Sequence, residues 1–135
     1  MPRIERLRQN TPEWQRWRLG GIGASDAPVL MGDVAFKTPR MLWSMKTGRT
    51  GRDRDNPAAR RGRELEQLAR RVYEKRLGIQ MEPICLVHEE LDWMRASLDG
   101  INFDGDIVLE IKCPWNPRAH QALSSCQRRL NVDPP

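Results

Sequence analysis

The chain has 135 residues, with 23 lysines and arginines against 18 acidic residues, so its formal net charge is +5 and its isoelectric point is near 9.6. Apolar residues make up 39% of the chain but form only short runs, which predicts a globular protein and excludes a disordered chain or a membrane-spanning helix. The N-terminus lacks the apolar core of a signal peptide, so we expect a cytoplasmic protein. The basic excess fits a nucleic-acid partner without establishing one.

The first part of the chain predicts three short helices. Thr11-Pro12 is a typical helix start, with proline at the first helical position, and Gly20-Gly21 ends that helix. A second short helix is expected from Ser25 to Gly32. A third begins at Thr38-Pro39 and ends at Gly48.

A charged stretch without periodicity, residues 49–56, predicts a loop before the longest helix of the chain. That helix is expected to start at Asn56-Pro57 and to end at Gly78. Its apolar residues repeat at helical spacing and predict one buried stripe, formed by Leu65, Leu68, Ala69, Val72, Tyr73 and Leu77.

Beyond residue 80 the periodicity changes to that of strands. Three strands are expected, at 83–88, 93–98 and 107–112, and Asp99-Gly100 through Gly105-Asp106 supply the turn residues between the last two. A terminal helix is expected over residues 117–130. The order of elements predicts an α+β fold, with N-terminal helices, a long helix, a three-stranded sheet and a short C-terminal helix, in one domain of residues 1–135.

The cysteines and histidines do not predict a zinc site or a disulfide framework. The three cysteines are odd in number and widely spaced, and neither histidine stands at ligand spacing from them. We interpret Cys85, Cys113 and Cys126 as reduced or buried residues.

Three residues near the predicted hairpin form a candidate hydrolytic centre. Glu110 and Lys112 are two apart on the expected third strand and therefore project from the same face. Asp99 ends the expected second strand, and pairing of the two strands brings it towards them. Two carboxylates suit Mg²⁺, which prefers oxygen ligands, lowers the pKa of bound water and neutralises charge on a phosphate. Lys112 would then orient or deprotonate the attacking water, or stabilise that charge.

The same residues also fit an ordinary hairpin. A Glu-x-Lys sequence is common on the solvated face of a strand, and Asp99-Gly100 is a frequent turn dipeptide. Spacing alone does not decide between the two interpretations.

The motifs around these residues extend over about residues 13–120. They are Trp14–Ser25, Lys37–Pro39, Leu42-Trp43, Lys46–Gly48, Gly62–Glu66, Tyr73–Lys75, Ala96–Gly100 and Glu110–Pro114. In this order they resemble the YqaJ-type viral recombinases, the family of lambda exonuclease within the PD-(D/E)XK nucleases. The resemblance implies a restriction-endonuclease-like core and a metal-dependent DNA exonuclease of phage or prophage recombination, acting from 5′ ends of double-stranded DNA.

The resemblance also implies roles for individual residues. Asp99 and Glu110 would be metal ligands, Glu66 an additional acid near the metal, and Lys112 the catalytic lysine. The metal would be Mg²⁺, with Mn²⁺ as an alternative.

Two further residues match positions that bind the 5′-phosphate of the DNA end in this family. Arg18 offers the bidentate contact that suits a phosphate, and Ser25 would lie at the mouth of a helix, where free backbone N–H groups attract anions. A simple helix N-cap is the alternative role for Ser25.

The family implies double-stranded DNA ends as the partner, with a phage single-strand annealing protein and a homo-oligomer as further candidates, in the cytoplasm of a bacterial host. The sequence departs from the family near its end, where a helix with a Tyr-x-x-Gln pattern and a further strand are expected and no tyrosine follows Tyr73. We therefore expect weak or undetectable nuclease activity from the 135 residues alone. Two alternatives stay open: an inactive remnant that still binds DNA, and a restriction-like endonuclease.

Overall fold

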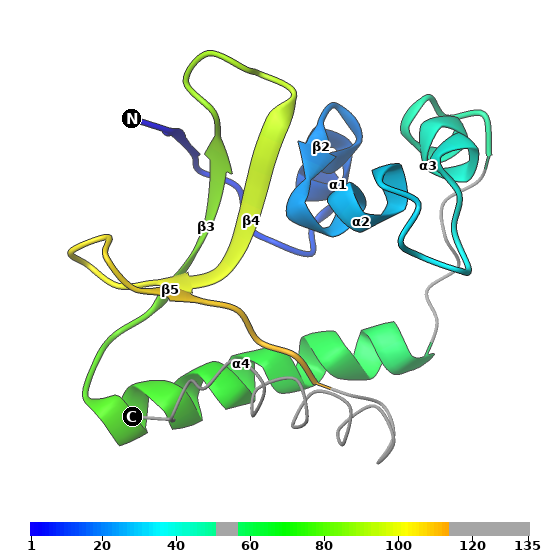
Figure 1. Cartoon of the computed structure of the whole chain (residues 1–135). Coiled ribbons are helices and arrows are strands. Elements are labelled where there is room, and N and C mark those ends of the chain that lie inside the picture. Colours follow the sequence, from blue (N-terminus) through cyan, green and yellow to red (C-terminus); the bar gives the residue numbers. More distant parts are fainter. Residues whose placement is uncertain (51–56, 114–135) are drawn as a thin grey trace. The chain divides into compact units, whose positions relative to one another are not determined.

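A computed structural model of the chain describes residues 1–50 and 57–113 (Figure 1). The chain divides into two compact units, one of residues 1–54 and 79–110, the other of residues 55–78 and 111–135. The first unit holds the sheet and the short helices, and the second holds the long helix. In the described ranges, no helix has the length and apolar character needed to cross a membrane.

The sheet of the first unit has five strands. They are β1 (Arg3–Glu5), β2 (Ile22–Gly23), β3 (Glu82–Val87), β4 (Met94–Ile101) and β5 (Val108–Leu109). The order is β1-β3-β4-β2, and β5 also pairs with β4. The β2–β4 pair is parallel and the other pairs are antiparallel. The predicted three-stranded sheet is therefore wrong in number: β1 and β2 were missed because two or three residues are too few to show alternation.

The long β3–β4 hairpin contains a β-bulge at the position of the candidate acid Asp99. The register runs from Ile84 opposite Leu98 to Glu82 opposite Ile101, so Pro83 alone faces both Asp99 and Gly100. Proline has no backbone N–H to give to the ladder, which makes a bulge the place in a paired strand where it fits best. The hairpin is also the apolar centre of this unit, because Cys85 and Val87 on β3 are almost fully buried.

The bulge corrects the expected position of Asp99. The second predicted strand was to end before Asp99-Gly100, whereas β4 continues to Ile101 and the turn begins at Asn102. Asp99-Gly100 therefore lies inside a strand, and its interpretation as a turn dipeptide is wrong. The third predicted strand, 107–112, is shorter than expected, since only Val108 and Leu109 are assigned to it.

Three short helical segments follow β1, and the first and third begin where predicted. They are α1 (Pro12–Leu19), α2 (Ala27–Leu30), preceded by the 3-10 turn η1 (Ala24–Asp26), and α3 (Pro39–Lys46). The side chains of Thr11 and Thr38 accept hydrogen bonds from backbone N–H groups of α1 and α3, as N-caps do.

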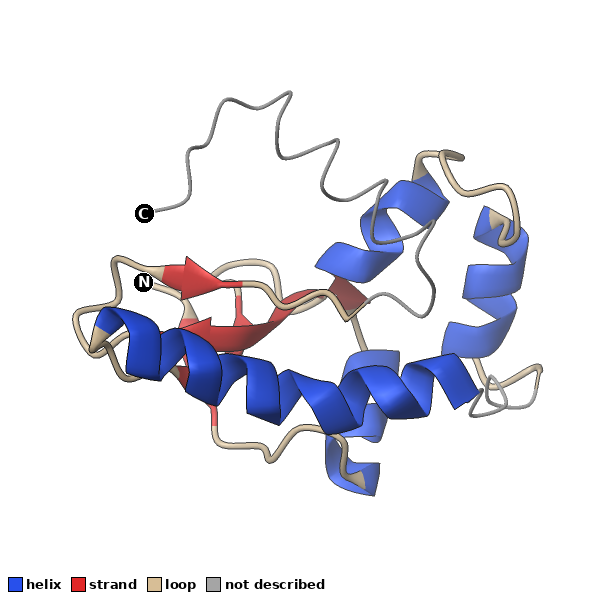
Figure 2. Ribbon diagram, turned by 90° about the horizontal axis from the view of Figure 1, so that it is seen from below, coloured by secondary structure: helices blue, strands red, loops and turns tan. Residues whose placement is uncertain are grey.

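The second unit contains α4 (Pro57–Leu77), drawn as one continuous helix in Figure 2. It ends at Gly78, whose φ of +70° is the left-handed value that glycine adopts at helix ends, as predicted. The expected stripe is only partly correct, because Leu68 and Val72 are exposed. The Asn56 cap and the terminal helix at 117–130 lie outside the described residues.

Candidate active site

The pairing of β4 with β5 ends next to two of the predicted acids. Gly100 pairs with Leu109 and Ile101 with Val108. The same antiparallel register, carried one step further along both chains, would set Asp99 opposite Glu110. Facing residues of an antiparallel pair have their Cβ atoms about 4.5–5.5 Å apart. Asp99 is partly buried and Glu110 is exposed, so this end of the hairpin is open to solvent.

Asn102 fixes the turn that sets this register. Its buried side chain accepts hydrogen bonds from the backbone N–H groups of Asp106 (3.1 Å) and Ile107 (2.9 Å) and donates one to the Asp106 carboxylate (2.6 Å). Gly105 completes the turn with a φ of +75°. These hydrogen bonds within the turn help to hold β5 against β4.

Gly100 brings the two strands close together beside Asp99. A Cβ atom at this glycine would lie 3.0 Å from the Cβ of Met81 and 3.3 Å from the Cβ of Leu109. A larger residue would therefore push β5 or the chain before β3 away. Glycine at the bulge keeps the backbone that carries Asp99 next to the backbone that leads to Glu110.

The two facing carboxylates suit a divalent cation but do not enclose one. Within residues 1–50 and 57–113 there is no group of three or more His, Cys, Asp or Glu side chains arranged to hold a metal. Mg²⁺ commonly keeps several waters and binds through one or two carboxylates together with substrate phosphates. Asp99 and Glu110 fit that mode of binding.

The other two predicted residues of the centre belong to the second unit. Glu66 lies on α4 and forms an ion pair with Arg70, one turn further on, at 3.1 Å. Lys112 is exposed and follows Glu110 by two residues, beyond the end of β5. The common face expected for Glu110 and Lys112 stays a prediction, because no strand is assigned beyond Leu109.

The structure brings together Arg18 and Ser25, the predicted phosphate-binding pair. The Arg18 guanidinium donates a hydrogen bond to Ser25 Oγ at 2.9 Å and lies over the Trp14 ring, 4.7 Å from its centroid. The N-cap alternative for Ser25 is wrong, because Ser25 is the second residue of η1, whose N-cap is Gly23. The hydroxyl is therefore directed to an arginine rather than to a helix end.

Trp14 joins this pair to the strand that carries Asp99. Its indole N–H donates to Ser97 Oγ at 3.0 Å, and Ser97 precedes Asp99 by two residues on β4. Ser97 also contacts the Cys85 thiol, whose pKa is raised because the sulfur is buried. The first unit therefore contains a series of contacts from Arg18 through Trp14 to Ser97, which lies two residues before Asp99 on β4.

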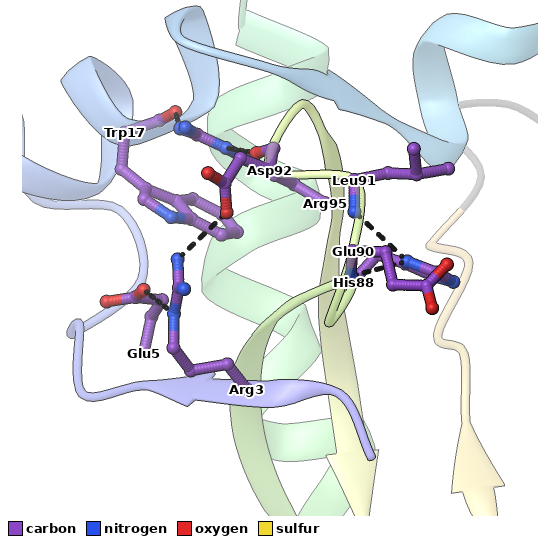
Figure 3. Close-up of polar contacts among 8 residues, drawn as sticks. All are labelled: Arg3, Glu5, Trp17, His88, Glu90, Leu91, Asp92 and Arg95. Carbon is purple, nitrogen blue, oxygen red and sulfur yellow. Dashed lines mark hydrogen bonds and ion pairs between the residues drawn. The ribbon is translucent and has the colours of Figure 1, made fainter.

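Arg95 holds the C-terminal end of α1 against β4, in a cluster of polar contacts drawn in Figure 3. Its guanidinium donates to the Trp17 carbonyl and lies over the Trp17 ring, 5.3 Å from the centroid. Its side chain passes so close to Gly21 that a Cβ atom there would lie 2.6 Å from the Arg95 Cδ. The Gly20-Gly21 sequence thus allows close packing as well as ending the helix.

Sequence reasoning missed a buried ion pair beside the Arg18–Ser25 pair. Lys46, at the end of α3, contacts the Asp26 carboxylate at 2.7 Å, and both side chains are largely buried. Lys46 stands in a motif that carried the family resemblance, but nothing in the spacing of residues 26 and 46 indicates that they meet.

Comparison with solved structures identifies the class of fold. The alkaline exonuclease LHK-Exo from Laribacter hongkongensis is similar to this chain, with a TM-score of 0.67 and 30% sequence identity over 93% of this chain and 62% of the exonuclease. The same exonuclease in complex with dAMP gives a TM-score of 0.63 and 26% identity. By its fold the chain is thus an α+β protein of the alkaline-exonuclease type.

Sequence comparison identifies the family. The model of the YqaJ-like viral recombinase domain matches residues 13–129. An uncharacterized protein of Bacillus subtilis (strain 168), YqaJ, is 33% identical over 103 residues, which are 74% of this chain and 32% of that protein. The chain therefore belongs to the family of the YqaJ-like viral recombinase domain. It spans about a third of YqaJ and under two thirds of LHK-Exo.

Proposed function

We propose that the chain carries the catalytic core of a metal-dependent DNA exonuclease of recombination, with a PD-(D/E)XK fold. The proposal rests most on the β4–β5 register, which would set Asp99 opposite Glu110 beside the β4 bulge if it continued by one residue. Bulges are frequent next to active sites, where they redirect a side chain. Membership of the recombinase family and similarity to an alkaline exonuclease support the same activity.

In this proposal Asp99 and Glu110 hold Mg²⁺ or Mn²⁺, and Glu66 is a further acid of the same site. When bound, the metal would supply a water of lowered pKa and neutralise charge on the scissile phosphate. Asp99 is held by the strand pairing on both sides of the bulge, so it can present its carboxylate in a constant position. Lys112 would take a proton from the attacking water or stabilise the developing negative charge.

Arg18 and Ser25 are proposed to bind the terminal 5′-phosphate of a double-stranded DNA end. Arginine with a hydroxyl partner offers several N–H and O–H donors to phosphate oxygens, and charge-assisted hydrogen bonds of this kind are strong. The Trp14–Ser97 hydrogen bond supports a position of the phosphate site near Asp99, because Ser97 lies two residues before Asp99 on β4. That LHK-Exo was crystallised with dAMP, a nucleotide bearing a phosphate, is compatible with such a site.

A DNA-binding remnant without activity is the second candidate function. A restriction-like endonuclease of the same fold is the third candidate.

A digestion assay separates these functions. Linear duplex DNA with 5′-phosphorylated ends should be degraded in Mg²⁺ and not in EDTA, whereas closed circular DNA of the same sequence should stay intact. Cutting of the circle would support the endonuclease. DNA binding without any digestion, in Mg²⁺ or Mn²⁺, would support the remnant.

A further inference from the structure

The side chain of Lys46 contacts the backbone next to the Arg18–Ser25 pair. Its ammonium donates to the backbone carbonyl of Arg18 at 2.8 Å and to that of Gly21 at 2.7 Å. Its third contact is the Asp26 carboxylate at 2.7 Å. An ammonium group has three N–H donors, so these contacts engage all of them.

Asp26 connects the same ammonium to the other member of the pair. It follows Ser25 directly in η1, and its carboxylate also accepts a hydrogen bond from the backbone N–H of Gly23 at 3.0 Å. One carboxylate therefore fixes the backbone on both sides of Ser25. Through Lys46 it is linked to the backbone of Arg18, whose guanidinium donates to Ser25 Oγ.

The pair is shielded from solvent, since the side chains of Lys46 and Asp26 are 16% and 11% exposed. Buried ion pairs of this kind add little net stability, because desolvation offsets the attraction, but they impose a particular geometry when every hydrogen-bonding group is satisfied. Lys46 and Asp26 come from separate elements, and the two residues that they fix are the proposed phosphate ligands.

We propose that Lys46 and Asp26 are positioning residues that hold Arg18 and Ser25 at the separation a terminal phosphate requires, and so determine the preference for 5′-phosphorylated DNA ends. This inference rests on the proposed function. Lys46 does not act as a phosphate ligand itself, because its three donors are engaged within the protein. Its effect on DNA passes through the backbone of Arg18 and through Asp26.

The test measures end preference rather than overall affinity. Dissociation constants are determined by fluorescence anisotropy in EDTA, so that no cleavage occurs, for two duplexes that differ only in a 5′-phosphate or a 5′-hydroxyl group. Lys46→Met, Asp26→Asn and Arg18→Met are compared with Arg40→Met, which removes an exposed charge from α3. The ratio of the two constants cancels the general loss of affinity that follows loss of a positive charge.

The wild-type chain should prefer the phosphorylated duplex by about tenfold or more, the effect of hydrogen bonds to a charged group. Arg18→Met should bring the ratio near one. Lys46→Met and Asp26→Asn should lower it at least about threefold, while Arg40→Met keeps the wild-type ratio. Circular dichroism checks folding, and Asp26→Asn, which keeps an oxygen for the Gly23 N–H, decides the question should Lys46→Met fail to fold.

The outcomes separate the two proposals. A wild-type ratio in both Lys46→Met and Asp26→Asn, with loss of preference in Arg18→Met, would overturn the positioning role and leave the phosphate site intact. An unchanged ratio in Arg18→Met, or a wild-type chain with no preference, would overturn the phosphate site and the positioning role together.

Discussion

The indole N–H of Trp14 donates a hydrogen bond to Ser97 Oγ at 3.0 Å, and this contact joins α1 to β4. The Trp14 ring also lies under the Arg18 guanidinium. One side chain thus links the arginine proposed to bind a DNA end with the strand that carries a proposed metal ligand. We therefore expect this contact to set the distance between the proposed phosphate-binding pair and the proposed metal site.

Trp14→Phe should uncouple these two parts while keeping an aromatic ring beneath Arg18. Loss of one hydrogen bond should lower the free energy of unfolding by about 0.5–1.5 kcal/mol, measured by urea denaturation. Ser97→Ala removes the same bond, so the double variant should lose less stability than the sum of the two single losses. Strictly additive losses would contradict the coupling. Trp43→Phe, at a half-exposed tryptophan of α3, is the control.

Gly100→Ala should damage the site through the backbone. The added methyl group would lie 3.0 Å from Met81 Cβ and 3.3 Å from Leu109 Cβ, so β5 would have to shift. We expect a loss of about 1–3 kcal/mol in stability, measured by thermal unfolding, and a fall in DNA digestion. Gly62→Ala adds the same group within α4, where alanine is favoured, and should be neutral or stabilising. Equal behaviour of the two variants would contradict the close approach at Gly100.

Cys85 should make the folded protein less stable at alkaline pH. Burial raises the pKa of this thiol above its ordinary value of 9.0. The folded state then keeps its proton at a pH where the unfolded state has lost it, so stability falls as the pH rises past the ordinary value. Urea denaturation between pH 8 and 10 should show this fall, and Cys85→Ala should reduce it. An identical slope for both proteins would show that the thiol does not contribute.

Lys112→Ala should lower the rate of DNA digestion by about a hundredfold or more, the usual contribution of a positioned proton-transfer group. Affinity for DNA should change little, because one exposed lysine is a small part of the basic charge. Lys75→Ala, at another exposed lysine of the chain, is the control and should keep wild-type digestion. A similar loss of rate in both variants would assign Lys112 to general DNA binding.

The helices could be predicted from local signals. Thr11, Thr38 and Gly78 act at the helix ends as their residue types indicate, because capping needs only neighbours in the sequence. The conformation of Asp99-Gly100 could not be predicted from its residue types, because this dipeptide fits a turn as well as a bulge. Pro83 inside a strand was the available signal for the bulge, but its meaning depends on the partner strand.

The site residues also divide into those that local sequence indicates and those that depend on packing between distant segments. Arg18 and Ser25 are close in sequence, and their side chains form a hydrogen bond. The Lys46–Asp26 pair joins residues twenty positions apart through the packing of α3, and no periodicity encodes that packing. The register that would bring Asp99 opposite Glu110 is set by the Asn102 turn, which the sequence showed only as a run of turn residues.

Replacement of Glu110 by glutamine is the sharpest test of the proposed metal site. The rate of Mg²⁺-dependent digestion of 5′-phosphorylated linear duplex is measured for wild type, Glu110→Gln and Glu82→Gln, the last at an exposed glutamate of β3. If Glu110 and Asp99 hold the metal, Glu110→Gln should lose digestion by at least about a hundredfold, because misplacement of a reacting group costs this much, while DNA binding and the Glu82→Gln rate stay unchanged. Digestion by Glu110→Gln at the wild-type rate would contradict a metal site that includes Glu110.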